Sequence, residues 1–251
     1  QRTSTVRLGA LVTGNTYRNP ALLAKTVTAL DIVSSGRAQL GIGAGWFGVE
    51  HDALGFEFGT FSDRFEKLEE ALQIILPMLR DERPTLAGKR YTVTDAVNQP
   101  TPVGRIPVMI GGNGDRLLRL AAEQADIVGL TGFTAGTGRT HTDLSHFTWD
   151  GLADRIAHVR RHAGERFAEI ELSVLVQAVQ RTDDRRAAAV EFAQGMIDDV
   201  EALLDSPFLL LGTDDERTAQ IARLRDEMGV TYVTTFEPGA EALAAAAAPL
   251  R

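Results

Sequence analysis

The sequence predicts an α/β fold built on a parallel sheet, and three observations lead to this prediction. Short apolar segments rich in branched residues recur along the chain. Segments with apolar residues at helical spacing separate them, and most connections are short. Strands that are buried on both faces and joined through helices form parallel sheets with right-handed crossovers. With 251 residues, 44% of them hydrophobic, the chain can bury a sizeable core.

The first expected strand covers residues 5–13, and a helix follows it. Asparagine is a good helix cap and proline suits the first helical turn, so Asn19 and Pro20 mark the start of this helix. Apolar residues recur at helical spacing as far as Gly36, a residue type common just beyond helix ends. Residues 37–43 then form the second strand.

Ser62 is the expected cap of a helix over residues 63–79, whose apolar side chains share one face. Residues 81–105 are rich in proline, glycine and charge, which predicts irregular structure with a short edge strand at 91–94.

A strand over residues 106–110 runs into the glycine-rich residues 111–114 and a further helix, and another strand covers 126–131. Residues 132–148 form a polar loop that is too long for a plain connector, so we expect it to be a lid. The remaining expected elements are a helix at 149–162, a strand at 169–179, an inserted helical segment at 183–205, a helix that Thr213 and Glu216 begin with a capping box, a strand at 230–236 and an alanine-rich final helix.

These elements amount to six parallel strands within a single domain over residues 1–251. A closed (β/α)8 barrel needs eight strands. The chain is therefore predicted to be either an open doubly wound sheet or a barrel whose first two β/α units precede Gln1.

Composition and absent motifs exclude several classes of function. A net charge of -8 argues against nucleic acid or an anionic membrane as a partner, and no apolar run reaches the ~18 residues of a membrane span. Without cysteine there is no disulfide or thiolate metal site. Only His158 and His162 have helical ligand spacing, and they are expected to face solvent in an arginine-rich helix, so no metal site is predicted. A cytoplasmic protein is the default expectation.

Residues 39–55, QLGIGAGWFGVEHDALG, have three interpretations. Gly41 and Gly43 start a pattern like the dinucleotide fingerprint, but Trp46 stands in the place of the third glycine. The glycines could instead serve packing alone. We prefer a third interpretation, in which small residues at a strand end let a flat ring approach the backbone and Trp46 forms an aromatic wall. Glu50 and His51 are possible acid or base groups, although anchoring of the loop is the commoner role.

Two further segments bear on binding. In VMIGGNGDR, backbone N–H groups at a glycine-rich helix start would suit a phosphate, while a packing role explains the glycines equally well. Thr13, Asn15 and Tyr17 stand at the carboxyl end of a strand, where barrels place ligands, although each also suits a turn. The chain has no P-loop, G-x-S-x-G or H-E-x-x-H motif.

Taken together, NPALLAKTVTALDIVSSGRAQLGIGAGWFGVEHDALG, GKRYTV and PVMIGGNGDRLLRLAAEQADIV give the chain a family resemblance. It resembles the bacterial luciferase-like superfamily, and most of all its coenzyme F420-dependent oxidoreductases of actinobacteria. The resemblance is specific from Thr5 to Val128 and looser over the rest.

That resemblance implies a TIM barrel, usually dimeric, that binds a flavin or deazaflavin at its carboxyl face. It implies a non-prolyl cis peptide behind the ring, here at Ala10–Leu11, with Trp46 beside the ring and residues of the second glycine cluster holding the cofactor. The cofactor-binding residues that it implies are Ala10, Leu11, Thr13, Trp46, Ile110, Gly111, Gly112, Asn113, Gly114 and Thr131.

The sequence also departs from the family. The first two β/α units have no counterpart, and many F420 enzymes carry their catalytic histidine or acid there. The catalytic residue is therefore predicted upstream of Gln1, with Trp46 and Glu50 as candidates inside the chain. Glucose-6-phosphate-specific members have a glutamate where this chain has Trp46, which argues against that substrate.

The predicted function is F420-dependent oxidoreduction, in which a hydride moves between the deazaflavin and a small organic substrate in a homodimer. An FMN-dependent monooxygenase of the same superfamily is the alternative. A non-catalytic flavin-binding or interaction protein is a third possibility, from a different class. We further expect Gly112→Trp to abolish cofactor binding while folding persists.

Overall fold

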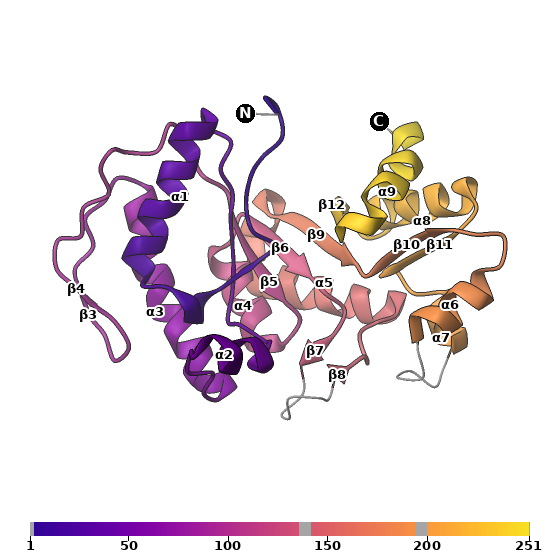
Figure 1. The fold of residues 1–251 in the computed structure, drawn as a ribbon, viewed down its shortest axis with the longest axis horizontal. Helices are drawn as coiled ribbons and strands as arrows, with labels where there is room; N and C mark the ends of the chain where they lie inside the picture. Colours follow the sequence, from indigo (N-terminus) through magenta and orange to yellow (C-terminus); the bar gives the residue numbers. More distant parts are fainter. Residues whose placement is uncertain (1–2, 136–141, 194–199, 251) are drawn as a thin grey trace. The chain divides into compact units, whose positions relative to one another are not determined.

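The computed structural model describes residues 3–135, 142–193 and 200–250. These residues fall into two compact units (Figure 1). The first contains residues 3–111 and 124–126, and the second contains residues 112–123, 127–135, 142–193 and 200–250. Within this described part, no helix is both long and apolar enough to cross a membrane.

The first unit is built on three parallel strands in the order β1 (Thr13–Gly14), β2 (Leu40–Gly43) and β5 (Val108–Gly112). Thr13 pairs with Ile42, and Leu40 pairs with Val108. All four residues of β2 are buried, which is the pattern of a central parallel strand covered on both faces.

Two helices of the first unit, α1 (Pro20–Ser34) and α3 (Phe61–Leu79), pack against each other (Figure 1). The predicted start and end of α1 are confirmed. Asn19 Oδ1 accepts from the backbone N–H of Ala21 at 2.9 Å, and Ser35 and Gly36 both adopt positive φ beyond the last turn.

Helix α3 begins earlier than predicted, because Thr60 and not Ser62 is its cap. Thr60 Oγ1 accepts from the Asp63 N–H at 3.1 Å, and Asp63 Oδ2 accepts from the Thr60 N–H at 3.1 Å. Such a capping box needs an acid three residues after the cap. Asp63 meets this spacing for Thr60, whereas Phe65 stands at that position relative to Ser62.

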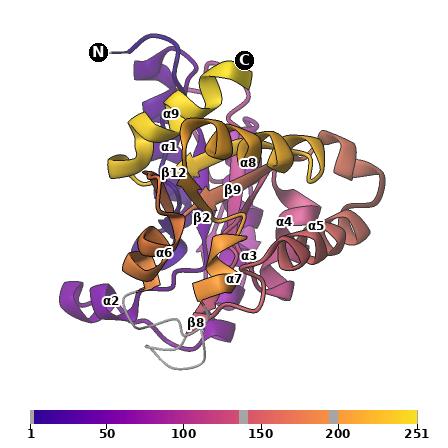
Figure 2. The ribbon, with the colours of Figure 1, turned by 90° about the vertical axis from the view of Figure 1, so that its right-hand side faces the viewer.

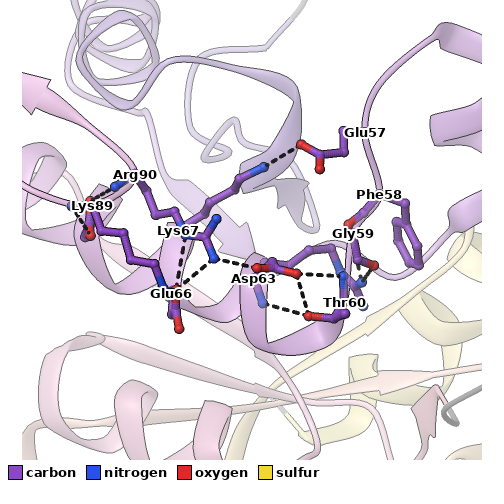
Figure 3. A network of polar contacts seen from close by, with 11 residues as sticks. Glu57, Phe58, Gly59, Thr60, Asp63, Glu66, Lys67, Lys89 and Arg90 are labelled. Atoms are coloured by element: carbon purple, nitrogen blue, oxygen red, sulfur yellow. Dashed lines mark hydrogen bonds and ion pairs between the residues drawn. The ribbon is translucent and has the colours of Figure 1, made fainter.

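A hairpin of β3 (Leu86–Ala87) and β4 (Thr92–Val93) is fastened to α3 by acidic side chains. Figure 3 shows Arg90 between Asp63 and Glu66, with N–O distances of 2.5 and 2.8 Å. Glu70 accepts from the backbone N–H groups of Lys89, Arg90 and Tyr91 at 2.8–2.9 Å. The expected edge strand at 91–94 is therefore one arm of a separate two-stranded hairpin.

The first strand is much shorter than predicted. Of residues 5–13, only Leu8 and Thr13 make strand-type pairs, with Ala38 and Ile42 respectively. The chain between them is irregular and contains a cis peptide bond at Leu11–Val12. The expectation that this segment is buried is also wrong, because Val6 is 51% and Leu11 47% exposed and no residue from 5 to 13 is fully buried. An apolar pattern carries no information on an interrupted ladder of hydrogen bonds.

The second unit has three parallel strands in the order β6 (Ile127–Leu130), β9 (Glu171–Val176) and β12 (Val230–Thr235). A further parallel pair consists of β10 (Ala178–Arg181) and β11 (Leu209–Gly212). The helices and short strands of this unit are α4 (Asp115–Gln124), β7 (Thr134–Ala135), β8 (Thr142–Asp143), α5 (Trp149–Ala163), η2 (Gly164–Glu169), α6 (Arg185–Ala193), α7 (Val200–Leu204), α8 (Asp214–Asp226), η3 (Glu237–Gly239), α9 (Ala240–Ala247) and η4 (Ala248–Leu250).

Two features of the second unit differ from the prediction. The strand expected at 169–179 is divided at Gln177, whose N–H donates to Phe208 O at 2.8 Å, so its later half pairs with β11. The strand β11 itself was not predicted, although the apolar run from Phe208 to Leu211 marks it.

A buried arginine of α8, Arg217, joins α8 to α9. Figure 2 shows α9 lying along α8. Arg217 of α8 is 1% exposed, donates to Ala242 O at 2.7 Å and pairs with Asp214. Thr213 and Glu216 form the predicted capping box at the start of α8.

Helices α6 and α7 account for the described part of the segment 183–205. The predicted lid at 132–148 is described only at its ends, where β7 and β8 pair as antiparallel strands. Its centre, residues 136–141, lies outside the described residues, so a lid here remains a prediction.

Candidate functional site

The carboxyl ends of β1 and β2 bring four polar side chains of the first unit together. The short helix η1 (Asn15–Tyr17) follows β1, and α2 (Gly48–Leu54) follows β2. Because neighbouring parallel strands end at the same edge of a sheet, Thr16 and Tyr17 of η1 meet Glu50 and His51 of α2. Parallel α/β folds carry their binding and catalytic residues at this edge.

His51 lies at the centre of this cluster and is 1% exposed. Its Nδ1 is 2.8 Å from the Phe47 carbonyl oxygen, which can only accept, so Nδ1 carries a proton. Its Nε2 is 2.6 Å from Thr16 Oγ1, and its ring stacks on Tyr17 with centroids 4.5 Å apart. His51 therefore anchors the loop after β2 onto η1, the role given above as the commoner one.

Glu50, a catalytic candidate in the sequence, accepts a hydrogen bond from the Tyr17 hydroxyl at 2.5 Å. Burial of the ring and the neighbouring Glu50 carboxylate raise the pKa of Tyr17 to about 12. The phenol is thus protonated at neutral pH and holds Glu50 in place. That Glu50 also acts as a catalytic residue remains a prediction.

Arg64 of α3 is a second buried anchor of the same loop. It is 7% exposed, and burial lowers the pKa of its guanidinium. It donates to the carbonyl oxygens of Gly45 at 3.1 Å and Gly59 at 3.0 Å, and it lies 3.8 Å above the Phe58 ring. All of these contacts point into the loop.

Trp46 and Phe47 lie outside this polar core, at the surface. Trp46 is 65% exposed and Phe47 45% exposed, and their rings stack with centroids 5.0 Å apart. Exposed aromatic pairs of this kind commonly mark binding surfaces. The predicted aromatic wall is thus accessible on the first unit, while its contact with a cofactor remains a prediction.

The glycines of β2 have a different role from the one expected. A Cβ at Gly41 would lie 2.1 Å from the Ala10 carbonyl oxygen, and one at Gly43 would lie 3.0 Å from Val12 Cγ2. The space beside these glycines is therefore filled by residues 10–12 of the same unit. The interpretation that they admit a ring directly is wrong, because the preceding chain segment occupies that space.

The non-prolyl cis peptide implied by the resemblance is present, but one bond later than predicted. It joins Leu11 and Val12, not Ala10 and Leu11. Leu11 is 47% exposed, and Thr13 Oγ1 accepts from Arg18 at 3.0 Å. Of the implied cofactor residues, Ala10 and Leu11 lie in the irregular segment and Thr13 begins β1.

In the second unit, Asn113 precedes α4 and is 2% exposed. Its Nδ2 lies 3.2 Å from His146 Nδ1 and 3.4 Å from Thr134 Oγ1. Its Oδ1 is buried and has no hydrogen-bond partner among the described residues. At Gly114, a Cβ would have no neighbour closer than Thr134 Cγ2 at 4.0 Å. The start of α4 thus combines open space with a buried amide whose hydrogen bonding is incomplete.

The start of α4 is fastened to α5. The Asp115 carboxylate is 2.5 Å from Arg155 Nη1, and this hydrogen bond lowers the pKa of Asp115. His158 Nε2 lies 3.2 Å from the Asp115 carbonyl oxygen, and burial lowers the pKa of His158. The expectation that His158 faces solvent is wrong: its side chain is 13% exposed, because α5 packs this face on α4.

The other implied residues have mainly structural surroundings. Ile110 is fully buried in β5, Gly111 is the next residue of that strand, and Thr131 Oγ1 donates to the Phe133 carbonyl at 3.0 Å. A Cβ at Gly112 would lie 2.1 Å from Leu117 Cδ2. Gly112 is therefore required for packing, whatever it binds.

Sequence reasoning did not assign roles to Thr16, Arg64 or His146. Arg64 looks like any exposed residue of an amphipathic helix, and its burial arises from the loop that folds over it. Thr16 and His146 gain importance only through partners distant in sequence. The nearest signal was the sequence EH at 50–51, three residues after Phe47 of the aromatic pair.

Several solved structures share this fold. The coenzyme F420-dependent tetrahydromethanopterin reductase from Methanopyrus kandleri has a TM-score of 0.74 and 17% identity, with 97% of this chain and 82% of that chain covered. An F420-dependent secondary alcohol dehydrogenase in complex with an F420-acetone adduct has a TM-score of 0.74 and 18% identity, with coverages of 93% and 74%. At these identities the likeness shows the fold alone, a luciferase-like TIM barrel.

The sequence relatives, like these two structures, are named as F420-dependent enzymes. The F420-dependent glucose-6-phosphate dehydrogenase of Microbacterium testaceum is 34% identical over 126 residues, which are 50% of this chain and 37% of the relative. The enzyme of the same name from Kineococcus radiotolerans is 29% identical over 188 residues, 74% of this chain and 54% of the relative. The chain thus spans about half or less of the length of these relatives.

The fold and the strand-end residues define an α/β barrel protein of the luciferase-like class. The family of luciferase-like monooxygenases matches residues 1–248, and the chain belongs to that family. The predicted family and fold class are confirmed. The absence of two leading β/α units remains a prediction.

Proposed function

We propose that this protein is an F420-dependent oxidoreductase that acts on a small organic molecule. The observation that carries the proposal is the agreement of two comparisons: the sequence relatives and two of the structural neighbours are all named as F420-dependent enzymes. A soluble small-molecule substrate is consistent with those names, and a homodimer remains a prediction.

The residues of this chain fit such a cofactor. Asn113, whose buried Oδ1 has no hydrogen-bond partner in the part of the chain that the structure describes, and the open Gly114 stand at the start of α4 in the second unit. A helix start with exposed N–H groups suits a phosphate, and a buried amide offers a further hydrogen bond.

We assign distinct tasks to these residues. When bound, the deazaflavin would supply the hydride chemistry, and the protein supplies binding and orientation. Asn113 and Gly114 would hold the phosphate-bearing chain. Trp46 and Phe47 would exclude water from the substrate, which favours hydride transfer because the reacting atoms must approach to ~3–3.5 Å.

The proposal is tested by titrating the purified protein with F420 and, separately, with FMN, and following the fluorescence of each cofactor. We expect saturable binding of F420 and weaker binding of FMN. Tight FMN binding without F420 binding would instead support the monooxygenase alternative. Two findings favour that alternative: the family is named for monooxygenases, and the monooxygenase RslO1 from Streptomyces bottropensis has the same fold, with a TM-score of 0.69 and 17% identity. Binding of neither would favour the non-catalytic alternative.

A further inference from the structure

We propose that Trp46 and Phe47 form a rigid platform for a flat, uncharged organic substrate, so that a sugar phosphate is a poor ligand of this protein. This inference rests on the proposed function, because it names the class of molecule that the same site takes. It departs from the relatives, whose names specify glucose 6-phosphate.

The platform offers a large aromatic surface to solvent. Trp46 is 65% exposed and Phe47 is 45% exposed. Their rings stack at 5.0 Å with 29° between their planes, so Phe47 supports the indole from one side, while the 65% exposure of Trp46 leaves most of the indole accessible. A third aromatic ring stacked on such a surface gains about twofold to tenfold in affinity beyond the burial of its area.

The backbone on both sides of Trp46 is held by buried side chains. The carbonyl of Gly45, just before Trp46, accepts from Arg64 Nε at 3.1 Å. The carbonyl of Phe47, just after it, accepts from His51 Nδ1 at 2.8 Å. Both anchors are less than a tenth exposed. The tryptophan is therefore presented by a fixed peptide segment, which lowers the entropy lost when a ligand binds.

The charge around the platform opposes an anion. Residues 44–61 contain three acidic residues, Glu50, Asp52 and Glu57, and neither lysine nor arginine. The guanidinium of Arg64, three residues after this segment, is directed to carbonyl oxygens and to the Phe58 ring inside the loop, and the Lys67 ammonium lies 3.5 Å from the Glu57 carboxylate. A phosphate dianion would thus meet like charge without a cation from this segment, while a neutral ring has no such penalty.

The test measures binding to the purified protein by calorimetry at pH 7, with three probes. These are 2-naphthol, which is flat and uncharged, 2-naphthalenesulfonate, which adds an anion to the same ring system, and glucose 6-phosphate. We expect 2-naphthol to bind at least about tenfold more tightly than the sulfonate, and glucose 6-phosphate to bind more weakly still. Equal or tighter binding of either anion would overturn the proposal.

Variants locate the binding. Trp46→Ala should weaken 2-naphthol binding about tenfold or more, and Trp46→Phe should recover most of it, since a ring is restored. The control Val33→Ala removes an exposed apolar side chain of α1 and should change the affinity less than about twofold. Unchanged binding in Trp46→Ala would contradict the platform, and the Trp46→Phe result excludes misfolding as the cause of a loss.

F420 titration of the same samples separates this inference from the proposed function. If F420 binds but 2-naphthol shows no preference over the sulfonate, the platform is wrong and the proposed function stands. If 2-naphthol behaves as expected but F420 does not bind, the proposed function is wrong while the platform stands.

Discussion

His51 Nε2 lies 2.6 Å from Thr16 Oγ1, and this hydrogen bond joins two strand-end segments 35 residues apart in sequence. With the bond from Nδ1 to the Phe47 carbonyl, it leaves both ring nitrogens of a fully buried histidine partnered. The loop that carries Trp46 is therefore organised around a histidine that sequence reasoning treated as a possible acid or base.

Replacement of His51 by alanine should destabilise the protein by about 2–4 kcal/mol, because it leaves a cavity and removes partners from Thr16 Oγ1 and the Phe47 carbonyl. Urea unfolding measures the change. The matched control is Glu50→Gln, an exposed neighbour, for which about 0.5 kcal/mol or less is expected. Equal losses in the two variants would show that His51 is no special anchor.

Tyr17 should titrate abnormally. Burial and Glu50 raise its pKa from 10.0 to about 12. A raised pKa in the folded state means that this tyrosine stabilises the protein below pH 10, and that the contribution is lost as the pH rises from 10 towards 12. Tyrosinate absorbance at 295 nm in wild type and Tyr17→Phe isolates this group. A difference spectrum with its midpoint near pH 10 would contradict the assigned environment.

Glu70 should make stability depend on acid pH. Burial opposes its ionisation, but three backbone N–H groups of the hairpin outweigh this and lower its pKa below 4.5. The stabilisation is therefore present above pH 4.5 and is lost as the pH falls through the lowered value. Glu70→Gln should be less stable than wild type at pH 7, with the difference shrinking at pH 3. A constant difference, or the same result for the control Glu69→Gln, would refute this account.

Gly112 and Gly114 should respond oppositely to substitution. A side chain at Gly112 meets Leu117, so Gly112→Ala should cost about 1–3 kcal/mol of stability, and Gly112→Trp, which the sequence alone led us to expect to fold, should be destabilised further. Gly114→Ala has room, so its stability should change by about 0.5 kcal/mol or less. If the proposed phosphate site is right, Gly114→Ala should still weaken F420 binding about tenfold. Thermal unfolding and F420 titration of both variants decide between these outcomes.

Much of the fold was predictable because it depends on local patterns. The caps at Asn19 and Thr213 and the apolar periodicity of α1 and α3 are properties of neighbouring residues, and the structure reproduces them. The family was predictable because its motifs are contiguous in sequence. The errors in the strands occur where pairing is interrupted, at residues 9–12 and at Gln177, since pairing is decided by distant partners. The cap of α3 was also misplaced, at Ser62 instead of Thr60.

For the candidate site, the sequence by itself determined which segments stand at strand ends, that Trp46 follows β2, and that a glycine-rich turn opens α4. Only the tertiary structure decided that Gly41 and Gly43 make room for Ala10 and Val12, and that His51 and Arg64 are buried anchors and not surface groups. The physical reason is that burial and hydrogen-bond partners are properties of the whole packing arrangement. A histidine or arginine has the same intrinsic chemistry in either setting, and its neighbours in space determine its role.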